Sequence, residues 1–114
     1  PGVSSALAAP LMAGFPLTDT QLSGSFAVVT GHVPGGIDWE GLRAADTLVI
    51  LMGARGLAQI AAGLVSAGRS PDTPVCIIRS AGAGSEQQGV WRGTLATIAS
   101  VTAGQQLSPC IIVV

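Results

Sequence analysis

The stretch TLVILMGARGLAQIAAGLVSAGRSPDTPVCII, residues 47–78, decides the fold class. Residues 47–52 form an apolar run that is typical of a buried strand. Residues 54–67 place apolar side chains at helical spacing and end at Gly68, which predicts a helix with a glycine stop. Residues 74–78 form a second buried strand. A strand, a helix and a strand in this order predict an α/β domain whose sheet is mostly parallel.

The segments on either side continue the alternation of helices and strands. Their patterns predict a helix over 4–13 capped by Ser4 or Ser5, a strand over 26–30, a short helix over 38–43, an extended piece over 89–92, a helix over 94–101 and a strand over 109–114. The whole pattern predicts a three-layer domain, in which helices cover both faces of a sheet of about five strands.

Ligands of such sheets bind beyond the carboxyl ends of the strands, where connecting loops converge. Here the loops expected at that edge are residues 32–36, 52–56 and 79–84. No glycine-rich dinucleotide fingerprint opens a helix after a first strand. The residue pattern alone therefore predicts an α/β domain with ligand-facing loops and leaves the ligand open.

Composition excludes several classes of protein. The chain has 114 residues, which suits one domain, and a net charge of −1. All of its basic side chains are arginines and they are scattered, so no basic stripe for nucleic acid exists. No apolar run is long enough to predict a membrane span. A chain so poor in charge is expected to have one face covered by a partner.

The reactive side chains are few. His32 is the only histidine, which excludes a zinc site built on several histidines. Cys76 and Cys110 both lie in apolar, strand-like runs. Buried free thiols are the favoured interpretation for them, and a disulfide is the second.

Seven segments taken together carry a resemblance to a known family. They are PGVSSALAAPLMAGFPLT (1–18), SFAVVTGH (25–32), DWEGL (38–42), ADTLVILMG (45–53), PDTPVCIIRSA (71–81), RGTLATIA (92–99) and SPCIIVV (108–114). In this order and at this spacing they resemble the tetrapyrrole methylases, in particular the uroporphyrinogen-III C-methyltransferase branch. The resemblance extends over essentially the whole chain.

The resemblance implies a donor site for S-adenosyl-L-methionine, which would leave as S-adenosyl-L-homocysteine. In that family two α/β domains enclose a cleft that holds the folded methyl donor, and the enzyme is a homodimer. The positions that match the family's donor-binding residues are Ser4, Ser5, Met52, Ala81, Pro109 and Cys110. An adenosyl group needs an apolar slot and backbone hydrogen bonds, which these residue types can provide.

The function implied by the resemblance is C-methylation of uroporphyrinogen III to precorrin-2, in sirohaem and cobalamin biosynthesis in the cytoplasm. The family's N-terminal GxGPGD turn and GGDPF block do not occur in the sequence. We therefore expect residues 1–114 to be the C-terminal part of such an enzyme, with the catalytic N-terminal half absent and with no activity alone. No membrane or nucleic-acid partner is expected.

Two departures keep other functions open. Asp19 and Thr20 stand where the family usually has His-Arg, and Leu51 replaces an aromatic residue before Met52. An acceptor rich in carboxylates would favour arginine over aspartate at the first of these positions. A methyltransferase of the same fold acting on another corrinoid intermediate, and a non-catalytic dimerisation module, therefore remain alternatives.

Overall fold

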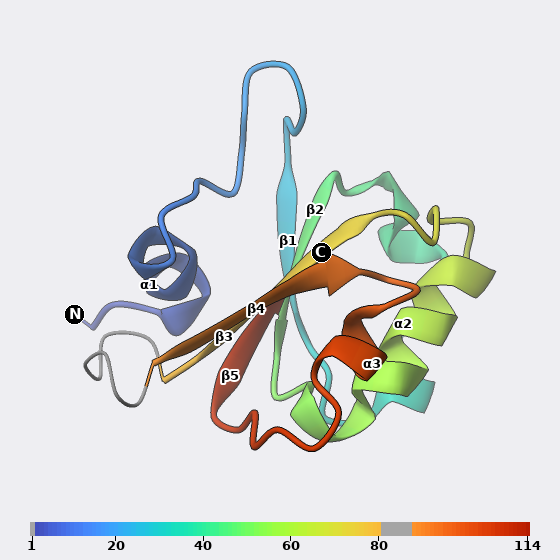
Figure 1. Cartoon of the computed structure of the whole chain (residues 1–114). Coiled ribbons are helices and arrows are strands. Elements are labelled where there is room, and N and C mark those ends of the chain that lie inside the picture. The colour runs from blue at the N-terminus through green and yellow to red at the C-terminus, as the bar shows by residue number, and fades with distance from the viewer. Residues whose placement is uncertain (1, 81–87) are drawn as a thin grey trace.

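The computed structural model describes residues 2–80 and 88–114, and its helices and strands follow the predicted order (Figure 1). These elements are α1 (Ser5–Met12), β1 (Phe26–Thr30), β2 (Thr47–Leu51), α2 (Leu57–Ser66), β3 (Pro74–Arg79), β4 (Gly89–Thr94), α3 (Ile98–Val101) and β5 (Cys110–Val113). Short 3₁₀ turns lie at Pro34–Gly36, Gly41–Ala44 and Ala54–Gly56.

The five strands form one sheet in the order β1–β2–β5–β3–β4, which confirms the α/β class. Strands β1 and β2 are parallel, and β5 lies antiparallel between β2 and β3. Strand β4 is antiparallel to β3. Strands β1, β2 and β3 thus share one direction, as predicted, but the sheet is mixed because β4 and β5 run in the opposite direction.

The direction of β5 brings its first residues to the edge where β2 and β3 end. Leu51, the last residue of β2, is opposite Ile111, and Arg79, the last residue of β3, is opposite Cys110. The start of β5 therefore lies beside the loops that follow β2 and β3. In a wholly parallel sheet the start of this strand would lie at the opposite edge.

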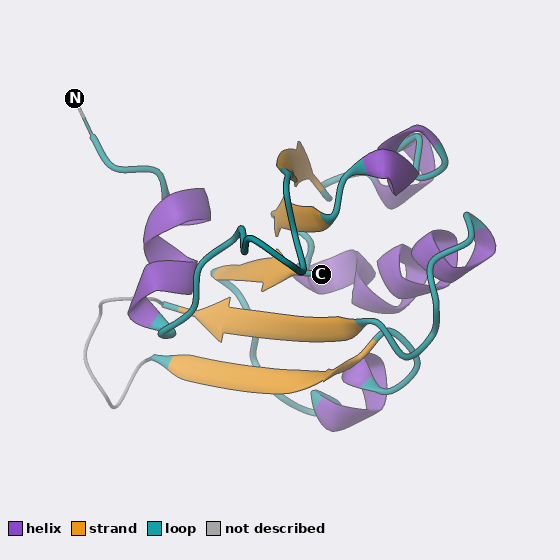
Figure 2. Cartoon of the chain, turned by 90° about the horizontal axis from the view of Figure 1, so that it is seen from above, coloured by secondary structure: helices purple, strands orange, loops and turns teal. Residues whose placement is uncertain are grey.

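Helices cover the two faces of the sheet, which confirms the three-layer arrangement (Figures 1 and 2). Helix α1 lies on one face, where Ala6 and Ala9 pack against Val49, Ile78 and Ile111. Helices α2 and α3 lie on the other face and cover the larger apolar cluster. The sheet is thus buried on both sides at its centre, which explains the apolar sequence of β2 and β5.

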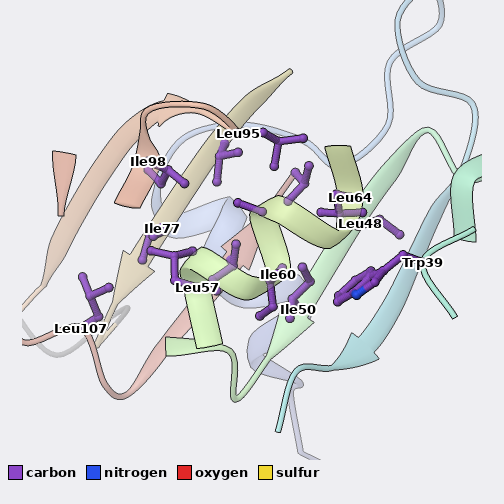
Figure 3. Close-up of a cluster of buried hydrophobic side chains, with 14 residues drawn as sticks. Trp39, Leu48, Ile50, Leu57, Ile60, Leu64, Ile77, Leu95, Ile98 and Leu107 are labelled. Atoms are coloured by element: carbon purple, nitrogen blue, oxygen red, sulfur yellow. The ribbon is translucent and has the colours of Figure 1, made fainter. Parts of the chain in front are cut away.

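The larger cluster centres on a row of isoleucines that crosses three strands. Ile50, Ile112 and Ile77 are register partners on β2, β5 and β3, and all three are fully buried. Helix α2 turns its apolar side toward this row, as Figure 3 shows for Leu57 and Ile60. This packing fixes α2, and with it the loop that joins β2 to α2.

Two predicted helices are shorter than the sequence indicates. Thr94 ends β4 instead of capping a helix, because β4 pairs with β3 as far as Pro74 opposite Thr94. The backbone N–H of Thr94 donates to Oγ1 of Thr97, and α3 begins only at Ile98. The Asp38 side chain accepts the N–H of Gly41 at 2.9 Å, where the chain forms a 3₁₀ turn in place of the expected helix.

Gly53, directly after Met52, is expected to tolerate no side chain. A Cβ there would lie 2.8 Å from Cδ1 of Ile112 and 3.0 Å from Cδ1 of Ile60. We expect Gly53→Ala to lower the free energy of unfolding by about 1–2 kcal/mol, because the extra methyl overpacks the core. Urea denaturation measures the change. Gly2→Ala is the control, since no atom lies within 4 Å of that Cβ, and equal stability of the two variants would contradict the prediction.

Candidate functional site

A depression, called here the edge trough, runs along the sheet edge where β2 and β3 end and β5 begins. Near α1 it holds a pocket of about 470 Å³, the apolar end, lined by Ser5, Ala9, Leu51, Met52, Ile78, Ser80, Pro109, Cys110 and Ile111. Beside it lies a pocket of about 610 Å³, lined by His32, Met52, Ala54, Arg55, Ser108, Pro109 and Cys110. The two pockets share Met52, Pro109 and Cys110, so they are parts of one surface.

Left-handed backbone at two residues shapes this edge. Met52 has φ 56° and Ser80 has φ 50°, directly after β2 and β3 respectively. Such a conformation costs a residue other than glycine about 1 kcal/mol, so the surrounding structure must hold it. It turns the chain sharply out of the sheet and leaves the Met52 side chain 64% exposed at the trough.

The backbone joins the two sides of the apolar end. The N–H of Ser80 donates to the carbonyl of Pro109 at 3.0 Å, which extends the pairing of β3 with β5 by one step. Pro109 and Cys110 line the same pocket as Met52 and Ser80. A slot of this kind offers apolar surface with backbone groups at its rim, which suits a nucleoside.

The structure brings most of the predicted donor-site residues together. Ser5, Met52, Pro109 and Cys110 line the same pocket. Ser4 lies one residue earlier, and its Oγ accepts the N–H of Ala6 at 3.2 Å, so this hydroxyl caps α1 as predicted. Ala81 lies outside the described residues.

The two cysteines are free thiols in half-buried positions, in line with the favoured interpretation. Burial raises the pKa of the Cys110 thiol. Burial also raises the pKa of the Cys76 thiol, against a smaller opposite effect from Arg92. Both side chains therefore stay neutral near pH 7 and serve as packing surface rather than as nucleophiles.

Charge at the 610 Å³ pocket is of one sign. Arg55 and His32 line it, and no aspartate or glutamate is among its lining residues.

Across residues 2–80 and 88–114, no group of three or more His, Cys, Asp or Glu side chains could hold a metal ion. Within the same ranges, no helix is long and apolar enough to cross a membrane.

The Asp19 carboxylate, one of the departures from the family pattern, accepts hydrogen bonds from backbone groups of its own turn. Its Oδ1 accepts the N–H groups of Gln21 and Leu22 at 2.9 and 3.1 Å. The same turn is tied to the start of β2, because the hydroxyls of Ser23 and Thr47 lie 2.7 Å apart. Asp19 therefore lies toward the end of the sheet opposite the trough.

The chain thus folds as a three-layer α/β domain with a trough where strands β2 and β3 end. The chain belongs to the tetrapyrrole (corrin/porphyrin) methylase family, whose model matches residues 1–99. This match confirms the resemblance carried by the six sequence segments that lie within residues 1–99.

Relatives of known activity agree with this assignment. The chain is 49% identical over 114 residues to a uroporphyrinogen-III C-methyltransferase of Synechococcus elongatus, covering all of this chain and 46% of that protein. It is 40% identical over 121 residues to the Bacillus subtilis enzyme of the same name, covering 25% of it. The chain thus spans about half, or less, of the length of these relatives.

A solved structure shares the fold. The crystal structure of uroporphyrin-III C-methyl transferase from Thermus thermophilus complexed with S-adenyl homocysteine matches with a TM-score of 0.80 and 30% sequence identity. The match covers 99% of this chain and 49% of the Thermus chain.

Proposed function

We propose that this chain is the C-terminal part of an S-adenosyl-L-methionine-dependent uroporphyrinogen-III C-methyltransferase, in which the apolar end of the edge trough forms one wall of the donor site. One observation carries the proposal: Ser5, Met52, Pro109 and Cys110 converge on a single pocket. The crystal structure of a Thermus relative holding S-adenyl homocysteine supports the identity of the ligand.

The chemistry demanded of this wall is modest. In methyl transfer an electron pair of a pyrrole carbon forms the new carbon–carbon bond as the methyl–sulfur bond breaks. The electron pair of the broken bond stays on sulfur, and the methylated acceptor releases one proton to solvent. The rate depends mainly on holding the methyl carbon and the acceptor carbon in line and near contact. Met52 and Pro109 provide apolar surface for the adenosyl group, and the flexible, polarisable Met52 side chain adapts its shape beside it.

The remaining half of the active site and the dimer contact are part of the same proposal. Helix α1 has no charged residue, and Leu7, Leu11 and Met12 on its outer side are exposed, as are Phe26 and Val28 on β1. A helix that is apolar all round is normally buried. This surface supports a homodimer in which a second subunit, together with the half of the enzyme outside residues 1–114, covers α1 and β1.

The proposed location is the cytoplasm. Two free cysteines suit a reducing compartment. The relatives of Synechococcus and Bacillus also bear the names of biosynthetic methyltransferases.

Calorimetric titration of the full-length protein that carries this chain with S-adenosylhomocysteine tests the donor site. We expect one site per subunit, and methyl transfer from S-adenosyl-L-methionine to uroporphyrinogen III in an activity assay. Donor binding without transfer to uroporphyrinogen III would instead favour another corrinoid acceptor. A folded full-length protein that binds no donor would favour the non-catalytic dimerisation module.

A further inference from the structure

The edge trough changes character along its length. Beyond the 610 Å³ pocket it continues into a pocket of about 390 Å³ lined by Ala54, Arg55 and residues 105–108. Arg55 lines both of these pockets, and Gln105, Gln106 and Ser108 add polar groups. The 610 Å³ and 390 Å³ pockets together are called here the polar end, and both are lined by Ala54, Arg55 and Ser108.

Three other arginines have evident roles within the fold. Arg69 donates to the backbone carbonyls of Ala45 and Asp46. Arg79 lies 5.0 Å from the centroid of the Trp91 ring and donates to the carbonyl of Gln106 at 2.6 Å. The Arg92 guanidinium lies over the Phe15 ring at 6.0 Å.

Arg55 differs from these three. Among the described residues no hydrogen bond, ion pair or ring contact occupies its guanidinium, and Arg55 lines both pockets of the polar end. It also lies in the 3₁₀ turn that leads into α2, where the positive end of the helix dipole adds to its charge. His32, from the loop after β1, lines the same pocket and supplies a second nitrogen-bearing side chain.

We propose that the polar end of the edge trough is a carboxylate-binding subsite, in which Arg55 pairs with the anion and His32 adds a hydrogen bond. The planar guanidinium presents a fork of donors that matches the two oxygens of a carboxylate. No acidic side chain lines either pocket at the polar end to compete for Arg55. The inference rests on the proposed function, since it assumes that a reactant occupies the adjoining apolar end.

Two reactants could bring the carboxylate. One is the methyl donor, through its aminoacyl group, and the other is the acceptor, through an acidic side chain of the tetrapyrrole. Both would place an anion next to the donor slot, and the chemistry recognised by Arg55 is the same.

The experiment uses the full-length protein and compares Arg55→Gln with Arg55→Lys and Arg43→Gln. Arg43 is exposed in the Gly41–Ala44 turn and lines none of the described pockets, so Arg43→Gln controls for the loss of one positive charge. Each variant is titrated with S-adenosylhomocysteine and with 5′-methylthioadenosine, which lacks the carboxylate, and its KM for uroporphyrinogen III is measured. Thermal melts verify that each variant is folded.

We expect Arg55→Gln to weaken one interaction about tenfold, the usual size for a hydrogen bond to a charged group. A higher KM for uroporphyrinogen III with unchanged donor affinity assigns the carboxylate to the acceptor. Weaker binding of S-adenosylhomocysteine, but not of 5′-methylthioadenosine, assigns it to the donor. Arg55→Lys should lose less than Arg55→Gln in the same measurement, because it keeps the charge.

Two results would overturn the subsite: Arg55→Gln behaving like Arg43→Gln in every measurement, or Arg55→Lys losing as much as Arg55→Gln. Failure of the proposed function is visible separately, in the unsubstituted protein. If that protein binds no S-adenosylhomocysteine and methylates no tetrapyrrole, the function and the subsite fall together.

Discussion

Replacing Ile112 by alanine is expected to lower the free energy of unfolding by about 3–4 kcal/mol. Ile112 is fully buried on β5, the strand that joins the two halves of the sheet, between Ile50 and Ile77. Removing its side chain loses the transfer free energy of three carbons and leaves a cavity that rigid neighbours on two strands cannot fill. Urea denaturation of the chain, with the variant measured beside it, gives the difference directly.

Val101→Ala is the matched control for this change. Val101 ends α3 with its side chain 46% exposed, so its truncation should cost under about 0.5 kcal/mol. A loss of less than 1.5 kcal/mol in Ile112→Ala would mean that the isoleucine row is not the centre of the core, and that the position of β5 needs revision.

Replacing Met52 by alanine is expected to lower the affinity of the full-length protein for S-adenosylhomocysteine about 30-fold, with the thermal midpoint unchanged within about 2 °C. Burying a methionine side chain against a ligand contributes about 2 kcal/mol, which corresponds to that factor. The fold loses little, because the Met52 side chain is mostly exposed in the chain alone. Calorimetric titration and a thermal melt measure the two effects.

The only other methionine provides the control. Met12 is 56% exposed at the end of α1 and lines none of the described pockets, so Met12→Ala should leave donor affinity unchanged. Collapse of the fold in Met52→Ala would show that the side chain belongs to the core. Unchanged affinity in a stable Met52→Ala variant would remove Met52 from the donor site.

The parts of the fold that the sequence predicts best are those with long, regular patterns. Residues 47–52 and 54–67 are predicted to within a few positions, because an apolar strand and an amphipathic helix each leave a repeating signal. The direction of β5 leaves none. A four-residue apolar strand reads the same in either direction, and only its pairing with β2 and β3 decides between them.

The candidate site, like the fold, is predicted from the sequence only in part. Ser5, Met52, Pro109 and Cys110 are predicted through the family resemblance, and the structure gathers them in one pocket. The left-handed backbone at Met52 has no sequence signal, because glycine or asparagine would be the usual residue there. Arg55 lies in loop 52–56, which the strand pattern already places at the ligand-facing edge. It is the only basic residue of that loop, so the sequence alone could have indicated it as a site residue.

The antiparallel insertion of β5 also determines when the domain can fold. Without residues 110–113 the sheet consists of two separate pairs, β1 with β2 and β3 with β4, which share no strand. Until β5 pairs, the domain therefore has four unpaired strand edges in place of two, and it closes the sheet in a single long-range step. The same step brings Pro109, Cys110 and Ile111 to the edge trough, so the trough forms only when the sheet is complete.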